Sequence, residues 1–287
     1  MKKIIAAAVA AAFVAPVYAA DISVSGEIEM TYVSNTGSQD AMSTADNNIV
    51  VSASDEVGGI SVTGSVQMDQ DTAFDGTGGD QTGTLTLGLP GGLTLNLGDV
   101  AGAMDSVGDY TDMAPAYGGF GADGSDHSAT VSLAVGPATV YASMSPQGGA
   151  LDGADSDETA FAVKVPFAGG EAYFATEEDS TAKWQTYGLK YAAAGFTVAF
   201  EKGSDDNGSA ADDKYTGLAF NYTMGDIVVG AESQEVKTDG SAASTDDVIT
   251  FVEYNLGSSI DLYVSQRSSS GTGSNVDGTT VGIEYVF

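Results

Sequence analysis

The chain has 287 residues, no cysteine and a formal net charge of −31, with 40 acidic against nine basic side chains. The absence of cysteine excludes disulfides, a thiolate nucleophile and zinc–thiolate sites. Nucleic acids are excluded as partners because phosphate binding needs a basic surface. The 13 tyrosines and 11 phenylalanines recur in alternating segments, which disordered chains lack.

The first 20 residues have the pattern of a secretory signal peptide. Two lysines precede an apolar, alanine-rich run (4–14), and cleavage is expected after Ala19 or Ala20. The run is too short for a spanning helix, and no later stretch reaches the ~20 apolar residues that such a helix needs. We therefore expect residues 1–20 to be removed. Residues 21–287 then form one exported domain with 40 acidic and seven basic side chains, a formal net charge of −33.

From residue 21 onward, apolar and polar side chains alternate in sixteen short segments. In the first segment Ile22, Val24 and Ile28 share one face, and polar side chains share the other. A period of two with one apolar face is that of a strand half in an apolar medium. Each segment is close to the 9–11 residues of a tilted membrane strand. The predicted strands are 21–33, 47–57, 60–69, 80–89, 92–98, 127–135, 138–144, 158–166, 169–177, 183–192, 195–203, 213–224, 226–236, 246–256, 258–267 and 276–287.

The connections between these segments alternate between short and long. Every second connection is a glycine-rich turn, some with proline, as tight hairpins require. The intervening connections are mostly long, polar and acidic, and the longest spans about 99–126. Short periplasmic turns and long extracellular loops are typical of bacterial outer-membrane barrels. We therefore predict an all-β fold, a transmembrane antiparallel β-barrel of sixteen strands.

The last segment of the chain predicts how this barrel closes. Its apolar face is formed by Val281, Ile283, Tyr285 and Phe287. The last strand of a barrel must pair with the first, because only closure removes the edges of the sheet. We expect 276–287 to pair with the first strand, and Tyr285 and Phe287 to serve as the closing and assembly signal.

The polar face of the strands predicts a water-filled lumen. Sixteen strands enclose a space too wide for side chains to fill, so charged inward side chains need no buried partner. By parity, further inward candidates include Glu171, Glu232, Glu253 and Asp261, and the register is ambiguous at 183–192, 226–236 and 246–256. The residues assigned to the pore wall are Glu27, Glu29, Lys164, Lys190, Arg267 and Glu284.

Aromatic side chains near the strand ends predict the boundary of the membrane. Trp184 and several tyrosines, among them Tyr32, Tyr191, Tyr254 and Tyr285, fall at such positions. An amphipathic ring suits the membrane–water interface. We expect these side chains to form an outward girdle.

Three stretches carry a family resemblance: the opening 21–28, the run 92–103 and the Tyr285-Val286-Phe287 end. In these stretches the chain resembles the general diffusion porins of Gram-negative bacteria, closest to the alphaproteobacterial trimeric type. The resemblance implies a homotrimer of sixteen-stranded barrels in the outer membrane, in contact with its lipid and lipopolysaccharide. It implies passive diffusion of small hydrophilic solutes, with no catalysis and no required cofactor. It also implies that the third loop, about 99–126, folds into the barrel and narrows the pore.

The chain departs from this family in its cations. Family members set wall arginines against the carboxylates of the third loop, whereas Arg267 is the only arginine here. The loop contains no Lys or Arg, and a constriction lined by carboxylates concentrates cations and repels anions. We therefore expect a cation-selective pore whose constriction is formed by Asp99, Asp105, Asp109, Asp112, Asp123 and Asp126.

Two alternatives from other classes remain open. Carboxylates can bind calcium, in the third loop through Asp105, Asp109 and Asp112, and the chain would then be a closed structural or adhesive barrel. His127, the only histidine, could belong to a Ser–His pair of a barrel hydrolase, but its place at a loop end favours a structural role. Stepwise conductance distinguishes an open channel from a closed barrel, and loss of esterase activity on replacing His127 would identify a hydrolase.

Overall fold

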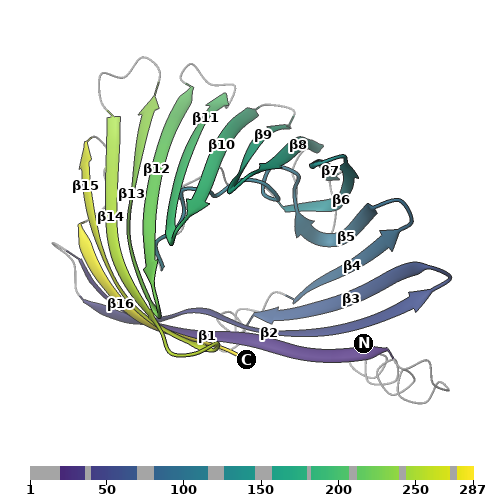
Figure 1. Cartoon of the computed structure of the whole chain (residues 1–287), viewed down its shortest axis with the longest axis horizontal. Helices are drawn as coiled ribbons and strands as arrows, with labels where there is room; N and C mark the ends of the chain where they lie inside the picture. The colour runs from purple at the N-terminus through teal and green to yellow at the C-terminus, as the bar shows by residue number, and fades with distance from the viewer. Residues whose placement is uncertain are drawn as a thin grey trace.

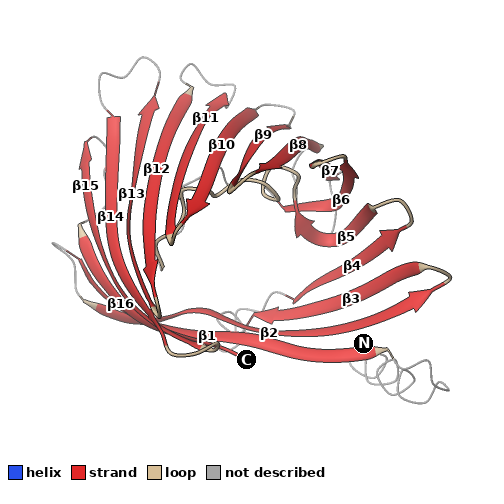
Figure 2. Cartoon of the chain, viewed as in Figure 1, coloured by secondary structure: helices blue, strands red, loops and turns tan. Residues whose placement is uncertain are grey.

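The computed structural model describes residues 20–35, 40–69, 81–115, 126–145, 157–179, 182–206, 212–238, 244–271 and 277–287. Residues 1–19 of the expected signal peptide lie outside this range. All regular structure in the described residues is β-strand (Figure 2). No helix long and apolar enough to cross a membrane occurs in this part of the chain. The strands are β1 (Asp21–Asn35), β2 (Ala41–Val57), β3 (Ile60–Asp69), β4 (Gln81–Leu89), β5 (Leu93–Ala101), β6 (Asp126–Val135), β7 (Ala138–Ser145), β8 (Glu158–Phe167), β9 (Gly170–Glu178), β10 (Lys183–Ala193), β11 (Phe196–Asp206), β12 (Asp213–Met224), β13 (Ile227–Thr238), β14 (Ser244–Asn255), β15 (Ile260–Gly271) and β16 (Gly278–Val286).

The strands form one closed antiparallel barrel in which each strand pairs with its neighbours in the sequence, and β16 pairs with β1 (Figure 1). Phe287 and Gly26 exchange two backbone hydrogen bonds of 3.0 Å. A Cβ at Gly26 would lie 2.7 Å from the ring of Phe287, so glycine leaves the room that this ring occupies. The predicted sixteen-stranded barrel and its closing strand pair are confirmed.

Short turns join strands at one end of the barrel, and longer connections, such as 102–125 between β5 and β6, join them at the other. L-residues rarely adopt positive φ, so glycine there makes a tight hairpin possible. The alternation of short and long connections follows the prediction. Glycines with positive φ occur in all seven short turns, at Gly58, Gly59, Gly91, Gly92, Gly136, Gly169, Gly195, Gly225 and Gly257.

The outward face of the barrel is apolar. Large apolar side chains on this face, such as Val24 and Ile283, remain more than one third exposed. Soluble monomers rarely present a continuous apolar surface of this kind, whereas the lipid-facing side of a membrane barrel does. Tyr32 and Tyr285 lie on this face, as expected. The prediction for Trp184 was wrong, because it shares the inward parity of β10 and packs against a cluster inside the barrel.

The structure also decides the registers that the sequence left open. On β14, Val248 and Val252 are exposed on the outward face, so Ile249 and Phe251 point inward, where they are 0% and 3% exposed. These two side chains pack against Ala114 from the connection between β5 and β6. Apolar residues occur on both parities because this part of the inner wall is covered by chain rather than by water.

Candidate functional site

Past the end of β5, the described part of the connection to β6 runs inside the barrel, along the inner wall (Figure 2). We call its described part, residues 102–115, the inner loop. At its start, the backbone N–H of Ala103 donates to Ser143 Oγ on β7 (2.8 Å). At Pro115 the backbone carbonyl accepts a hydrogen bond from Ser265 Oγ on β15 (3.4 Å). The inner loop therefore spans the wall from β7 to β15.

The first part of the inner loop is a compact turn that buries apolar side chains against the wall. The Gly102 carbonyl accepts from Ser106 N–H (2.9 Å), and the Met104 carbonyl accepts from Gly108 N–H (3.1 Å). Small wall side chains let the loop backbone come close, and alanine at inward positions is the sequence signal that could have located this contact. The packed cluster contains Ala103, Met104, Val107 and Tyr110 of the loop and Ala160, Ala162, Tyr173, Ala175, Ala199 and Ala219 of the wall.

Glu201 on β11 fixes the middle of the inner loop. Its Oε2 accepts the backbone N–H of Thr111 (3.0 Å) and the hydroxyl of Thr111 (2.7 Å). Its Oε1 accepts the hydroxyl of Tyr173 on β9. The Glu201 side chain is 0% exposed. Hydrogen bonds to an ionised carboxylate are stronger than those between neutral groups, so this buried carboxylate is a strong anchor for the loop.

Glu232 on β13 is a second anchor of the same kind. Its Oε2 accepts the backbone N–H groups of Met113 (2.7 Å) and Ala114 (2.9 Å), and the side chain is 2% exposed. Strand parity made Glu232 an inward candidate within an ambiguous register, whereas Glu201 was not among the predicted residues. Parity alone could not show that these carboxylates hold a loop instead of facing water.

Tyr110 connects the inner loop to a wall cation. Its ring meets that of Tyr173 edge to face, with centroids 4.8 Å apart, and Lys190 Nζ lies 4.9 Å from the Tyr110 centroid. Burial, together with the carboxylates of Glu171 and Glu201, raises the pKa of the Tyr110 hydroxyl above its ordinary value. The hydroxyl therefore stays neutral.

The predicted pore-wall residues all occupy inward positions of their strands. Lys190 lies 3.9 Å from Glu171, and Arg267 lies 2.8 Å from Asp247, measured between nitrogen and oxygen. Two of the three predicted wall cations are therefore next to carboxylates of the neighbouring strand. The inward positions include Glu27, Glu29, Lys164, Lys190, Arg267 and Glu284.

Five inward carboxylates gather where the barrel closes. Glu29, Glu284 and Asp261 lie directly opposite one another on β1, β16 and β15. Glu27 and Glu253 share the inward face of β1 and β14. We call these five residues the acidic seam. Cross-strand neighbours have Cβ atoms about 5 Å apart, and like charges at this distance destabilise a sheet.

The aspartates predicted to form the constriction do not all lie in the inner loop. Asp105, Asp109 and Asp112 lie in the inner loop and are partly exposed. Asp99 belongs to β5 and Asp126 to β6, so the loop is shorter than expected. The strand continues past Leu97 to Ala101. Its pairing with β6 shifts register between Leu97 and Val100, and Gly98 adopts a φ of +112° at this irregularity. Asp123 lies outside the described residues.

The groups considered for calcium binding and for hydrolysis lie in the inner loop and at the start of β6. Among the described residues, no three His, Cys, Asp or Glu side chains gather as a metal site, and calcium at Asp105, Asp109 and Asp112 stays a prediction. His127 Nδ1 lies 3.3 Å from Ser143 Oγ. Both side chains are buried, with exposures of 0% and 7%, so the pair is not accessible to a substrate.

Comparisons with solved structures give the same fold. A loop L8 deletion mutant of OmpT, an outer membrane protein of Vibrio cholerae, superposes with a TM-score of 0.75 at 14% identity and covers 94% of this chain and 100% of its own. A triple mutant of Rhodopseudomonas blastica porin gives a TM-score of 0.75 at 19% identity, covering 93% of this chain and 100% of its own. Another engineered variant of the Rh. blastica porin gives 0.75 at 20% identity, with the same coverages. At these identities the likeness concerns the fold alone.

Sequence comparison identifies the family. A search of curated proteins finds no significant match. The sequence profile of the family described as Gram-negative porin matches residues 6–285, nearly the whole chain. This match agrees with the closed sixteen-stranded barrel and with the loop inside it. The chain therefore belongs to the Gram-negative porin family.

Proposed function

We propose that this outer-membrane porin is a passive, cation-selective channel for small hydrophilic solutes. The observation that carries the proposal is the charge imbalance on the inward face of the barrel. Among the described strand residues, the inward cations are Lys164, Lys190 and Arg267, and the last two lie beside carboxylates. The acidic seam adds five carboxylates to the same inward face. A wall of this kind lowers the energy of a cation in the lumen and raises that of an anion.

The inner loop supports the same proposal. It occupies lumen space along β7 to β15, where its contacts hold it against the wall. Its partly exposed aspartates, Asp105, Asp109 and Asp112, add negative charge to the narrowed part of the pore. The two buried anchors, Glu201 and Glu232, position this loop, and we infer that they set the size of the opening.

Three further properties are proposed on the family resemblance and the composition. We propose that residues 1–20 are removed on export, that three copies assemble into a homotrimer, and that the barrel contacts lipopolysaccharide. The intact mass of protein isolated from outer membranes tests the first, since cleavage removes the first 20 residues. Chemical cross-linking in membranes tests the second, with a dimer-only or monomer-only pattern contradicting it.

A planar-bilayer measurement tests the selectivity. In a KCl gradient, the sign of the reversal potential shows whether K⁺ or Cl⁻ carries more current, and we expect K⁺. Replacing Glu27, Asp261 and Glu284 by their amides should reduce the reversal potential while stepwise openings persist. An anion-selective reversal potential in the natural protein would contradict the proposal. The absence of openings would favour a closed structural barrel instead.

A further inference from the structure

A side-chain hydrogen bond crosses the strand that closes the barrel. The hydroxyl of Tyr263 on β15 donates to Oε1 of Glu29 on β1, which is 234 positions away in the sequence. The strand between them is β16, which pairs with β15 on one side and with β1 on the other. Tyr263 and Glu29 are only 3% and 6% exposed, so water competes little for this bond.

Gly282 on β16 leaves the room through which Tyr263 reaches β1. The two residues lie directly opposite each other on neighbouring strands. A Cβ at Gly282 would collide with Cε1, Cζ and the hydroxyl of Tyr263, so the far end of the ring lies over this glycine. An inward side chain ordinarily meets its cross-strand neighbour, whose Cβ is about 5 Å away. Tyr263 passes this neighbour because glycine has no side chain.

The same arrangement occurs elsewhere in the barrel, at the first anchor of the inner loop. Tyr173 on β9 lies over Gly188 on β10, and its hydroxyl donates to Glu201 on β11. Gly188 lies directly opposite both Tyr173 and Glu201. We call this arrangement a tyrosine brace: a tyrosine crosses a glycine of the next strand and donates to a carboxylate of the strand beyond it. One brace holds Glu201 and the other holds Glu29.

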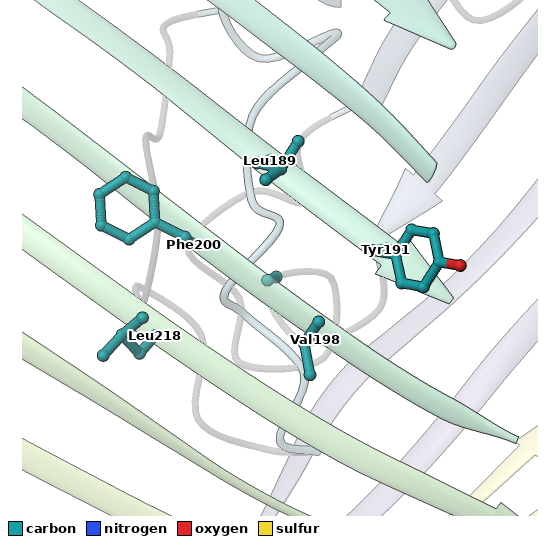
Figure 3. A pocket seen from close by; sticks show the side chains of 6 residues that line it. Leu189, Tyr191, Val198, Phe200 and Leu218 are labelled. Atoms are coloured by element: carbon teal, nitrogen blue, oxygen red, sulfur yellow. The ribbon is translucent and has the colours of Figure 1, made fainter. Parts of the chain in front are cut away.

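The lipid-facing side of the wall behind each brace is an apolar groove. Behind the Glu201 brace, a groove of about 230 Å³ is lined by Leu189, Tyr191, Val198, Phe200 and Leu218 (Figure 3). Behind the Glu29 brace, a groove of about 310 Å³ is lined by Val252, Tyr254, Leu262, Val264 and Val281, together with Tyr263 and Gly282. A carboxylate is costly in such surroundings. Both carboxylates therefore have to stay on the inner side of the wall, where the tyrosines hold them.

The Glu29 brace lies where the closing strands bring like charges together. Glu29 lies directly opposite Glu284, which in turn lies directly opposite Asp261. Like charges directly opposite one another destabilise a sheet, and this row crosses the strand pair that closes the barrel. Tyr263 and Gly282 lie two residues further along their strands, a distance of about 7 Å. The bond to Tyr263 therefore draws the Glu29 carboxylate toward Gly282 and away from Glu284.

We propose that the brace of Tyr263, Gly282 and Glu29 holds β16 against β1 and lets the barrel close across a row of carboxylates. The bond ties β15 to β1 over β16, so β16 cannot separate from β1 while it stays paired with β15 unless the bond breaks. The same bond reduces the repulsion between Glu29 and Glu284. The lumen thereby keeps the acidic seam in a closed wall. The proposal does not depend on whether the pore selects cations.

Amide hydrogen exchange measured by mass spectrometry tests the proposal, because it reports the separation of individual strands. Refolded protein in a non-ionic detergent is compared with Y263F, which keeps the ring over Gly282 and removes only the hydroxyl. The matched control, Y254F, removes a tyrosine hydroxyl from the lipid-facing side of the same region of the wall. Peptides from β1 and β16 report the closing strand pair, and peptides from β6 and β7 report the wall far from it.

We expect Y263F to exchange the amides of β1 and β16 about tenfold faster than the natural protein, and those of β6 and β7 within about twofold. A hydrogen bond to a charged group changes an equilibrium constant by about tenfold or more, and strand separation is such an equilibrium. Y254F should exchange like the natural protein in all four strands. In the E29A background, Y263F should add less than about a twofold change, because the acceptor is already absent.

Three results would overturn the proposal. These are natural exchange of β1 and β16 in Y263F, an equal increase in β6 and β7, or an undiminished effect of Y263F in the E29A background. If E29A does not fold, judged by heat-modifiable gel mobility, E29Q replaces it. The effect of Y263F should then be at least about threefold smaller than in the natural protein, because a hydrogen bond to a neutral amide is weaker than one to a carboxylate. An undiminished effect would again overturn the proposal.

Discussion

Replacing Glu201 by alanine should release the inner loop from the barrel wall. The substitution removes the acceptor for the backbone N–H and the hydroxyl of Thr111, at 3.0 and 2.7 Å. Tyr173 loses its bond to Glu201 as well, but its hydroxyl keeps Thr186 Oγ1 at 3.0 Å. The damage is therefore concentrated on the loop rather than on the strands.

The size of the effect follows from the two bonds to the loop. A hydrogen bond to a charged group contributes about 1.5–3 kcal/mol, so two of them contribute about 3–6 kcal/mol. Water in the lumen can reach the freed groups of Thr111, which lowers the loss to roughly 2–3 kcal/mol. This corresponds to a decrease of about 30- to 150-fold in the ratio of attached to detached loop.

Single-channel recording in planar bilayers is the assay. We expect Glu201→Ala to give larger conductance and stronger current fluctuations than the natural protein. Glu253→Ala is the matched control, because it removes an inward carboxylate on β14 that makes no hydrogen bond to the described part of the inner loop. The reasoning is refuted if folded Glu201→Ala shows natural conductance and noise. It is also refuted if Glu253→Ala shows the same change.

Three other predictions concern steric clashes at two glycine positions and calcium binding. Gly217→Ala should displace the inner loop without changing its charge, since a Cβ there would lie 2.5 Å from Thr111 Oγ1. Its single-channel recordings should resemble those of Glu201→Ala, and current fluctuations equal to those of the natural protein would contradict this. Gly26→Ala should weaken barrel closure, because a Cβ would lie 2.5 Å from the backbone oxygen of Asn48 and 2.7 Å from the Phe287 ring. Its unfolding midpoint in urea should fall by an amount corresponding to roughly 1–3 kcal/mol of overpacking, and an unchanged midpoint would contradict this expectation. If calcium bridges the loop aspartates, a chelator lowers the unfolding midpoint, and an unchanged midpoint retires the calcium hypothesis.

Most of the barrel could be predicted from local patterns. Alternation with a period of two identified the strands, and glycine-rich turns alternating with long loops gave their antiparallel order. Parity placed Glu29 and Glu284 on the inward face, and closure then brought them directly opposite each other. These features depend on neighbours in the chain or in the adjacent strand, so a linear pattern contains them.

The sequence by itself thus determined the strand number, the closure of the barrel and which charges face inward, because alternation is a local property of an extended chain. Only the tertiary structure decided which inward residues face water and which face the loop. Glu201 lies 90 positions from Thr111 in the sequence, and Ile249 is buried by a loop that begins near residue 102. Contacts across the lumen join segments far apart in the chain, and the alternation of apolar and polar residues does not predict them. The same reason explains why Trp184 packs inward against the cluster that the inner loop forms with the wall.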